Sequence, residues 1–119
     1  MTPTELIDET VSAYAADPVA LRARDILGSD ILGTCVFITK DGRKCALGRC
    51  LKKKFVHEAY MYPFEEIVSQ VKAKYKGFSQ QFWRELQSLH DVDEYWNKGG
   101  LSKHGERCVA NMKEKYDTN

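Results

Sequence analysis

Apolar residues recur at helical spacing in four separate stretches of the chain. Spacings of three and four residues place such side chains on one face of an α-helix, so each stretch predicts an amphipathic helix. The four stripes are Ile7, Val11 and Tyr14; Phe64, Ile67, Val68, Val71 and Tyr75; Phe82, Leu86 and Leu89; and Cys108, Val109, Met112 and Tyr116.

Polar residues, prolines and glycines mark where these helices begin and end. The run Thr2-Pro3-Thr4-Glu5 has a capping threonine, a proline at the first helical position and a glutamate three residues after the cap. Asp17-Pro18 ends this helix near Ala16 and predicts a short second helix. The other predicted boundaries are Pro63 and Gly77 for the helix of the second stripe, Ser79 for the third and Ser102 for the last.

A β-hairpin is predicted around Asp41-Gly42, because this dipeptide tolerates the positive φ of a tight turn. The expected strands are 34–39 and 44–47, followed by a helix over 49–56. The small residues of Cys45-Ala46-Leu47-Gly48 allow another backbone segment to approach closely. An isolated hairpin is marginally stable and must pack on helices. The sequence therefore predicts one domain, 1–119, of α+β class, mostly helical, with about five helices.

The formal net charge of +1 hides an uneven distribution. Residues 1–30 carry six acids and two bases, residues 31–60 carry two acids and seven bases, and residues 61–119 carry nine of each. The central bases predict a surface that contacts an acidic protein or nucleic acid, although they equally fit a solvated face that complements the acidic first helix. They are Lys40, Arg43, Lys44, Arg49, Lys52, Lys53 and Lys54.

Cys45 is the candidate nucleophile of an alternative, enzymatic interpretation. At the start of a helix and beside basic residues, its pKa would be lowered toward a reactive thiolate. Such a cysteine needs an imidazole base, for which His90 is the main candidate and His57 and His104 are others. The competing interpretation is a small buried side chain at the junction of hairpin and helix, with Cys35 and Cys108 also in the core.

His90-Asp91 suggests a base with an orienting carboxylate, but neighbouring residues on a helix point about 100° apart and are not expected to pair. A half-buried structural histidine is the favoured interpretation. The cysteine spacings match no zinc ribbon or finger, so no metal and no cofactor are predicted.

The chain has more aromatic residues than one small core requires. Tyr95 and Trp96, in a predicted acidic loop over 91–100, are candidates for a partner-binding surface, since aromatic side chains anchor interfaces. The alternative is that Trp96 closes the core. The other members of the aromatic set are Tyr60, Tyr62, Phe64 and Trp83.

No apolar run approaches the roughly 20 residues of a membrane span, and the N-terminal residues do not have the pattern of a signal peptide. A cytoplasmic protein with reduced cysteines and no membrane partner is expected.

Several motifs resemble those of small uncharacterised proteins from phage and bacterial genomes. The matching residues are Tyr14-x-x-Asp17-Pro18; Asp41-Gly42-Arg43-Lys44-Cys45-Ala46-Leu47-Gly48-Arg49-Cys50-Leu51; Leu86-Gln87-x-Leu89-His90-Asp91; Trp96; and Gly100-Leu101-Ser102-x-x-Gly105. The resemblance implies a phage or mobile-element origin and brings no activity or site residue with it.

The leading hypothesis is a small binding or regulatory protein that contacts a host or viral macromolecule through the central bases. An acidic protein is the favoured partner and nucleic acid the second choice, because no nucleic-acid reading motif is present. The rival is a cysteine-dependent enzyme using Cys45 and His90. A structural metal-binding module is the weakest of the alternatives.

Overall fold

The computed structural model describes residues 1–22, 37–39 and 42–116, and these ranges contain five α-helices and one two-stranded antiparallel sheet. The helices are α1 (Pro3–Ala15), α2 (Pro18–Leu21), α3 (Phe64–Ser69), α4 (Gln80–Asp91) and α5 (Lys103–Tyr116). The strands are β1 (Trp96–Asn97) and β2 (Gly100–Leu101). The predicted class, α+β and mostly helical with one short antiparallel hairpin, is therefore confirmed.

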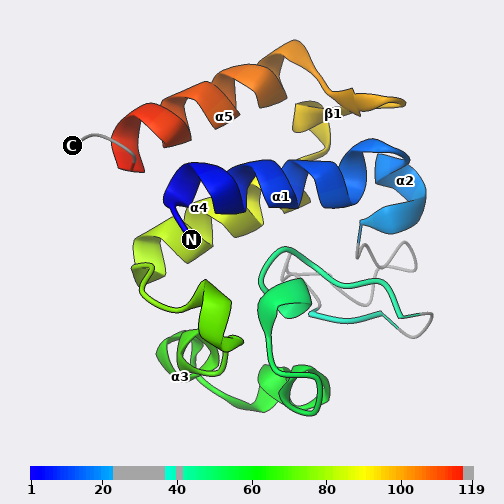
Figure 1. The fold of residues 1–119 in the computed structure, drawn as a ribbon. Helices are drawn as coiled ribbons and strands as arrows, with labels where there is room; N and C mark the ends of the chain where they lie inside the picture. Colours follow the sequence, from blue (N-terminus) through cyan, green and yellow to red (C-terminus); the bar gives the residue numbers. More distant parts are fainter. Residues whose placement is uncertain (23–36, 40–41, 117–119) are drawn as a thin grey trace.

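Single 3₁₀ turns supply most of the remaining regular structure in the described ranges. They are η1 (Gly48–Cys50), η2 (Phe55–His57), η3 (Ala59–Met61), η4 (Ala73–Tyr75) and η5 (Asp93–Tyr95). Helices α1, α4 and α5 form one side of the molecule, which we call the helical half (Figure 1). Residues 48–77, with η1 to η4 and α3, lie below α1 and α4 in that view and form the turn half.

The helix starts follow the capping pattern of the sequence. Thr2 Oγ1 accepts a hydrogen bond from the Glu5 amide at 3.1 Å, and the Glu5 carboxylate accepts one from the Thr2 amide at 2.7 Å. This reciprocal pair is the predicted capping box. The hydroxyls of Ser79 and Ser102 each accept a hydrogen bond of 3.1 Å from an amide in the first turn of α4 and α5. These caps are confirmed.

One core cluster joins the two halves. Buried residues of the predicted stripes lie in it, among them Ile7 from α1, Leu86 from α4 and Met112 from α5. The segment Cys45–Leu47, just before the turn half, lies in the same cluster. Because each fully buried large apolar side chain contributes about 1.5–3 kcal/mol, this cluster is the main stabilising element of the fold.

The predicted hairpin at Asp41-Gly42 is only partly present in the described residues. Gly42 has φ +90°, as the turn requires, and Ile38 bridges Lys44. The predicted second strand, 44–47, is wrong beyond Cys45, because the chain turns there into η1. Gly48 lies so close to the backbone of Phe37 that a Cβ atom would be 2.1 Å from the Phe37 carbonyl oxygen. Residues 34–36 lie outside the described residues.

The two-stranded sheet lies instead in the segment predicted as an acidic loop. Trp96 pairs with Leu101 and Asn97 with Gly100, which has φ +145°. Two residues per strand are too few for an alternating pattern to show in the sequence.

Two helices predicted in the turn half are interrupted or shorter in the structure. The helix predicted over 49–56 is split into η1 and η2, and the one predicted to reach Gly77 stops at Ser69. Leu51 and Val71 form an isolated antiparallel bridge, with Lys52 N bonded to Gln70 O at 3.0 Å. This pairing keeps both segments extended at the points where helix was expected.

None of the helices in the described ranges has the length and apolar character needed to cross a membrane.

Candidate functional site

The predicted basic residues do not share one open surface. Lys40 lies outside the described residues. Arg43 and Lys44 are half-buried. Arg43 donates a hydrogen bond of 3.0 Å to the Arg22 carbonyl, and the Lys44 carbonyl accepts one of 2.6 Å from the Tyr14 hydroxyl. These contacts tie the described end of the hairpin to α1 and α2 rather than presenting it to a partner.

Arg49 faces inward, contrary to the expected exposed cation. Its guanidinium lies 3.0 Å from a carboxylate oxygen of Glu9 on α1 and 3.5 Å from the Tyr75 hydroxyl on η4. Burial alone raises the pKa of Glu9, but hydrogen bonds from Tyr75 and Arg49 outweigh it and bring that pKa below its ordinary value. Arg49 therefore fastens the turn half to α1.

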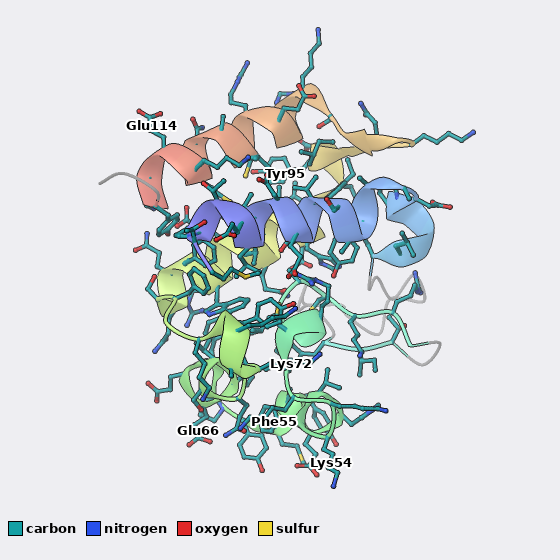
Figure 2. The ribbon with its side chains drawn as sticks, in the orientation of Figure 1. Lys54, Phe55, Glu66, Lys72, Tyr95 and Glu114 are labelled. Atoms are coloured by element: carbon teal, nitrogen blue, oxygen red, sulfur yellow. The ribbon has the colours of Figure 1, made fainter. Side chains whose placement is uncertain are left out.

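The three consecutive residues Lys52, Lys53 and Lys54, called here the lysine triplet, are the part of the predicted surface that faces water. All three side chains are exposed. Within the described ranges, no carboxylate pairs with their ammonium groups. Figure 2 shows Lys54 beside Phe55 at the outer end of the turn half, far from α5. The triplet is thus available to an acidic partner.

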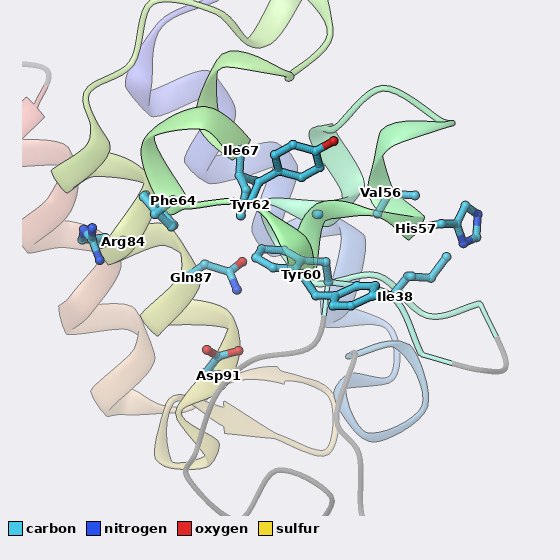
Figure 3. Close-up of a pocket in the computed structure, with 12 residues that line it drawn as sticks. Ile38, Val56, His57, Tyr60, Tyr62, Phe64, Ile67, Arg84, Gln87 and Asp91 are labelled. Carbon is cyan, nitrogen blue, oxygen red and sulfur yellow. The ribbon is translucent and has the colours of Figure 1, made fainter.

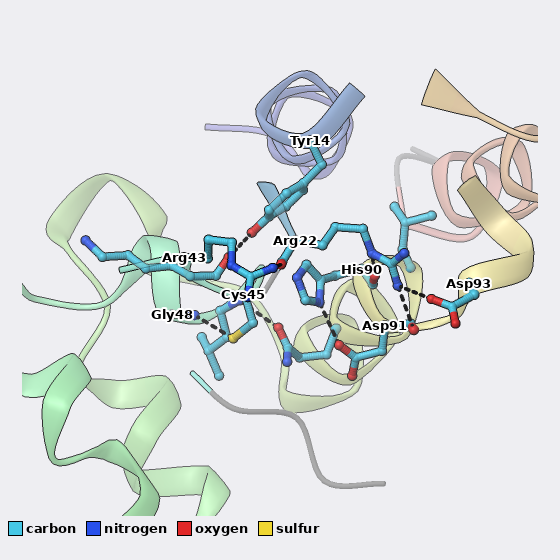
Figure 4. A network of polar contacts seen from close by, with 12 residues as sticks. Tyr14, Arg22, Arg43, Cys45, Gly48, His90, Asp91 and Asp93 are labelled. Carbon is cyan, nitrogen blue, oxygen red and sulfur yellow. Dashed lines mark hydrogen bonds and ion pairs between the residues drawn. The ribbon is translucent and has the colours of Figure 1, made fainter. Parts of the chain in front are cut away.

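Cys45 and His90 are both fully buried. Cys45 Sγ accepts a hydrogen bond from the Gly48 amide at 3.2 Å, within the close approach described above (Figure 4). A thiol with no exposed surface cannot meet a substrate without opening of the core, so this geometry gives the nucleophile hypothesis no support. Among the other cysteines, burial raises the pKa of Cys50 to about 12 and also raises that of Cys108.

His90 and Asp91 do pair, contrary to the expectation from helix geometry. His90 Nδ1 lies 2.6 Å from Asp91 Oδ1, and the imidazole meets the Tyr14 ring edge-on with centroids 4.9 Å apart. Asp91 is the last residue of α4, where the chain leaves the helix and its side chain can turn back toward the preceding ring. Arg22 donates to the carbonyls of His90 and Asp91 at 2.6 and 2.8 Å, which caps the end of α4 (Figure 4).

Trp96 lies in the core, as the second of the two interpretations predicted. It is 8% exposed and its indole N–H donates to the Leu89 carbonyl at 2.8 Å. Tyr95 is half-buried beside Cys108, which raises the pKa of its hydroxyl. The loop over 91–100 therefore does not supply the exposed aromatic surface that the sequence suggested.

Exposed aromatic residues are found in the turn half instead. Tyr60, Met61 and Tyr62, called here the aromatic segment, are 77%, 58% and 39% exposed. In the sequence this segment is visible as three adjacent large apolar residues before Pro63. Local spacing, however, could not show that their side chains stay outside the core. A run of this kind is unusual on a protein surface, which makes the aromatic segment a candidate binding surface.

The aromatic segment borders a groove of about 920 Å³, which we take as the candidate functional site (Figure 3). One wall is apolar and includes Val56 from η2, Ile67 from α3 and the rings of Tyr60 and Tyr62. Phe37 and Ile38, before the Asp-Gly turn, extend this apolar lining. A hollow of this size and character is typical of a site that receives apolar groups.

The opposite wall is a polar line along α4, formed by Arg84, Gln87 and Asp91. Spacings of three and four residues put the three side chains on one helical face. The Gln87 side-chain oxygen accepts a hydrogen bond from the Leu47 amide at 2.8 Å. The Asp91 carboxylate is hydrogen-bonded to the His90 ring. Arg84 is exposed, and its guanidinium carbon lies 4.3 Å from the centroid of the Phe64 ring.

Across the described ranges, no group of three or more His, Cys, Asp or Glu side chains is placed to hold a metal ion.

Comparisons of the chain with protein-family models, with curated proteins and with solved structures find no match. The resemblance to small phage and bacterial proteins therefore stays a prediction, and function has to be argued from the groove.

Proposed function

We propose that this protein is a small binding or regulatory protein that captures an acidic polypeptide segment through the groove, the aromatic segment and the lysine triplet. The observation that carries the proposal is the exposure of Tyr60 and Tyr62, which both line an apolar groove. Tyrosine, methionine and arginine are enriched where proteins contact one another. The proposal keeps the expectation of a cytosolic protein of phage or mobile-element origin.

The extent of the surface favours a polypeptide over a small molecule. Tyr60 keeps 77% of its surface exposed while bordering the groove, so a ligand confined to the hollow would leave most of this side chain in water. A polypeptide can place one apolar side chain in the groove and cover the aromatic segment with the next. Such central aromatic contacts supply most of the binding free energy at protein interfaces.

The pattern of charge favours a protein over nucleic acid. The lysine triplet is exposed, but Glu58, Glu65 and Glu66 are exposed beside the aromatic segment on both sides of it in the chain. A polypeptide can place its carboxylates at the lysines and avoid the glutamates. Nucleic acid carries a phosphate at every step and cannot avoid them.

A random dodecapeptide library displayed on phage tests the proposal with the full-length protein as bait. We expect selected peptides to combine apolar and acidic residues and to bind Tyr60→Ser at least about tenfold more weakly. Leu21→Ser is the matched control, because Leu21 is also an exposed apolar side chain, at 40%, but lies on α2. It should bind as the wild type does.

Reversal of the lysine triplet tests the charge argument separately. The variant Lys52→Glu, Lys53→Glu, Lys54→Glu should weaken binding of the same peptides and reduce its dependence on salt. The proposal fails if no selected peptide depends on Tyr60. It also fails if a 20-nucleotide oligo-dT binds in a Tyr60-dependent manner while the peptides do not.

A further inference from the structure

We propose that Arg84 is the specificity residue of the groove and pairs with a carboxylate that the bound polypeptide carries beside its apolar anchor. This inference rests on the proposed function and adds to it the position of one acidic group and the direction in which the segment lies.

The surroundings of Arg84 differ from those of the arginines that hold the fold together. Arg49 bonds to Glu9, and Arg43 donates to a backbone carbonyl. Arg84 is exposed, and among the described residues no carboxylate or carbonyl accepts a hydrogen bond from it. A side chain of this kind has its N–H groups available for an incoming ligand.

Stacking holds this guanidinium at the mouth of the groove. Its central carbon is 4.3 Å from the centroid of the Phe64 ring, which itself lines the groove. An arginine stacked on an aromatic face has fewer conformations to lose and keeps the edge of its planar fork for a carboxylate. Two parallel N–H···O bonds can then form, which a lysine at this position could not provide.

The other end of the same wall has the opposite charge. Asp91 lies seven residues after Arg84, about 10 Å along α4 at 1.5 Å per residue, and Gln87 lies between them (Figure 3). A carboxylate near Asp91 would be repelled, whereas one near Arg84 is attracted and lies about one Debye length from Asp91. The wall therefore favours one direction, with the acidic group of the segment at Arg84 and away from Asp91.

Charge reversal at Arg84 tests this inference. The same dodecapeptide library is selected against Arg84→Glu, and we expect peptides that keep their apolar residues but carry Lys or Arg where the wild type selects Asp or Glu. Arg107→Glu is the matched control, because Arg107 is also exposed and the charge change is the same, but it lies on α5 away from the groove. It should select the wild-type sequences.

Fluorescence anisotropy with the tightest acidic dodecapeptide gives the size of the effect. Arg84→Glu should weaken binding by roughly tenfold or more, and Arg84→Lys by less, because it retains the charge but loses the planar fork. The inference is overturned, with the proposed function intact, if Arg84→Glu selects the same acidic peptides in a Tyr60-dependent manner. Both are overturned if no selection depends on Tyr60.

Discussion

The helical half and the turn half are built in different ways. In the helical half, α1, α4 and α5 present apolar stripes to one another, and α4 alone buries Phe82, Trp83, Leu86 and Leu89. The turn half consists of short 3₁₀ turns and one six-residue helix, and it exposes the aromatic segment and the lysine triplet. The helical half supplies the long amphipathic helices of the shared core, whereas the turn half leaves large apolar and basic side chains exposed to water.

The largest effect on the free energy of unfolding is expected when a core side chain is truncated. Phe82→Ala should lower the free energy of unfolding by about 3–5 kcal/mol, because a 1% exposed ring that stacks on Phe78 would leave a cavity. Tyr60→Ala in the turn half should change it by less than about 0.5 kcal/mol, since this ring is 77% exposed. Urea unfolding followed by circular dichroism measures both. Similar losses for the two variants would contradict this difference between the halves.

A smaller effect is expected at the backbone contact that starts the turn half. Gly48→Ala would bring a Cβ atom to 2.1 Å from the Phe37 carbonyl oxygen, and the chain must move apart. We expect a loss of about 1–3 kcal/mol in the same urea experiment. Gly99→Ala is the control, because nothing lies within 4 Å of a Cβ atom there. If both substitutions are tolerated equally, the close approach is not what holds η1 in place.

The sequence predicted the helical half well for a physical reason. The stripes of α4 and α5 and the caps at Thr2, Ser79 and Ser102 depend on residues three or four positions apart, and such contacts are visible in a local pattern. The close backbone approach at Gly48 was also predicted, because a small residue after a turn favours close packing. These features require no knowledge of distant parts of the chain.

The turn half could not be predicted in the same way. Leu51 pairs with Val71, twenty positions later, and this contact overrides the helical spacing that includes Val71. The groove joins residues near 37, 56–67 and 84–91, so no local spacing identifies it. The apolar run Tyr60-Met61-Tyr62 was the available signal, and its meaning depended on exposure, which only the structure supplies.

The smallest effect on the free energy of unfolding is expected where the two halves are in contact through a hydrogen bond from Arg49 of η1 to Glu9 of α1. Arg49→Met should cost about 1–2 kcal/mol at pH 7, the range for a hydrogen bond to a charged group that is partly exposed. The pKa of Glu9 is below its ordinary value of 4.5 in the folded protein. The contribution of the Glu9 carboxylate to the free energy of unfolding is therefore complete above 4.5. It disappears as the pH falls through the lower pKa that Glu9 has in the folded protein.

The difference in unfolding free energy between the wild type and Arg49→Met should accordingly narrow between pH 5 and strongly acidic pH. The difference between the wild type and Glu9→Gln should narrow over the same pH range. Lys74→Met serves as the control, because Lys74 reaches Glu9 only at 3.8 Å from an exposed position and its removal should change little. A difference that stays constant as Glu9 is protonated would show that Arg49 acts through packing on Tyr75 and not through the carboxylate. In that case the turn half would keep its position on α1 in acid.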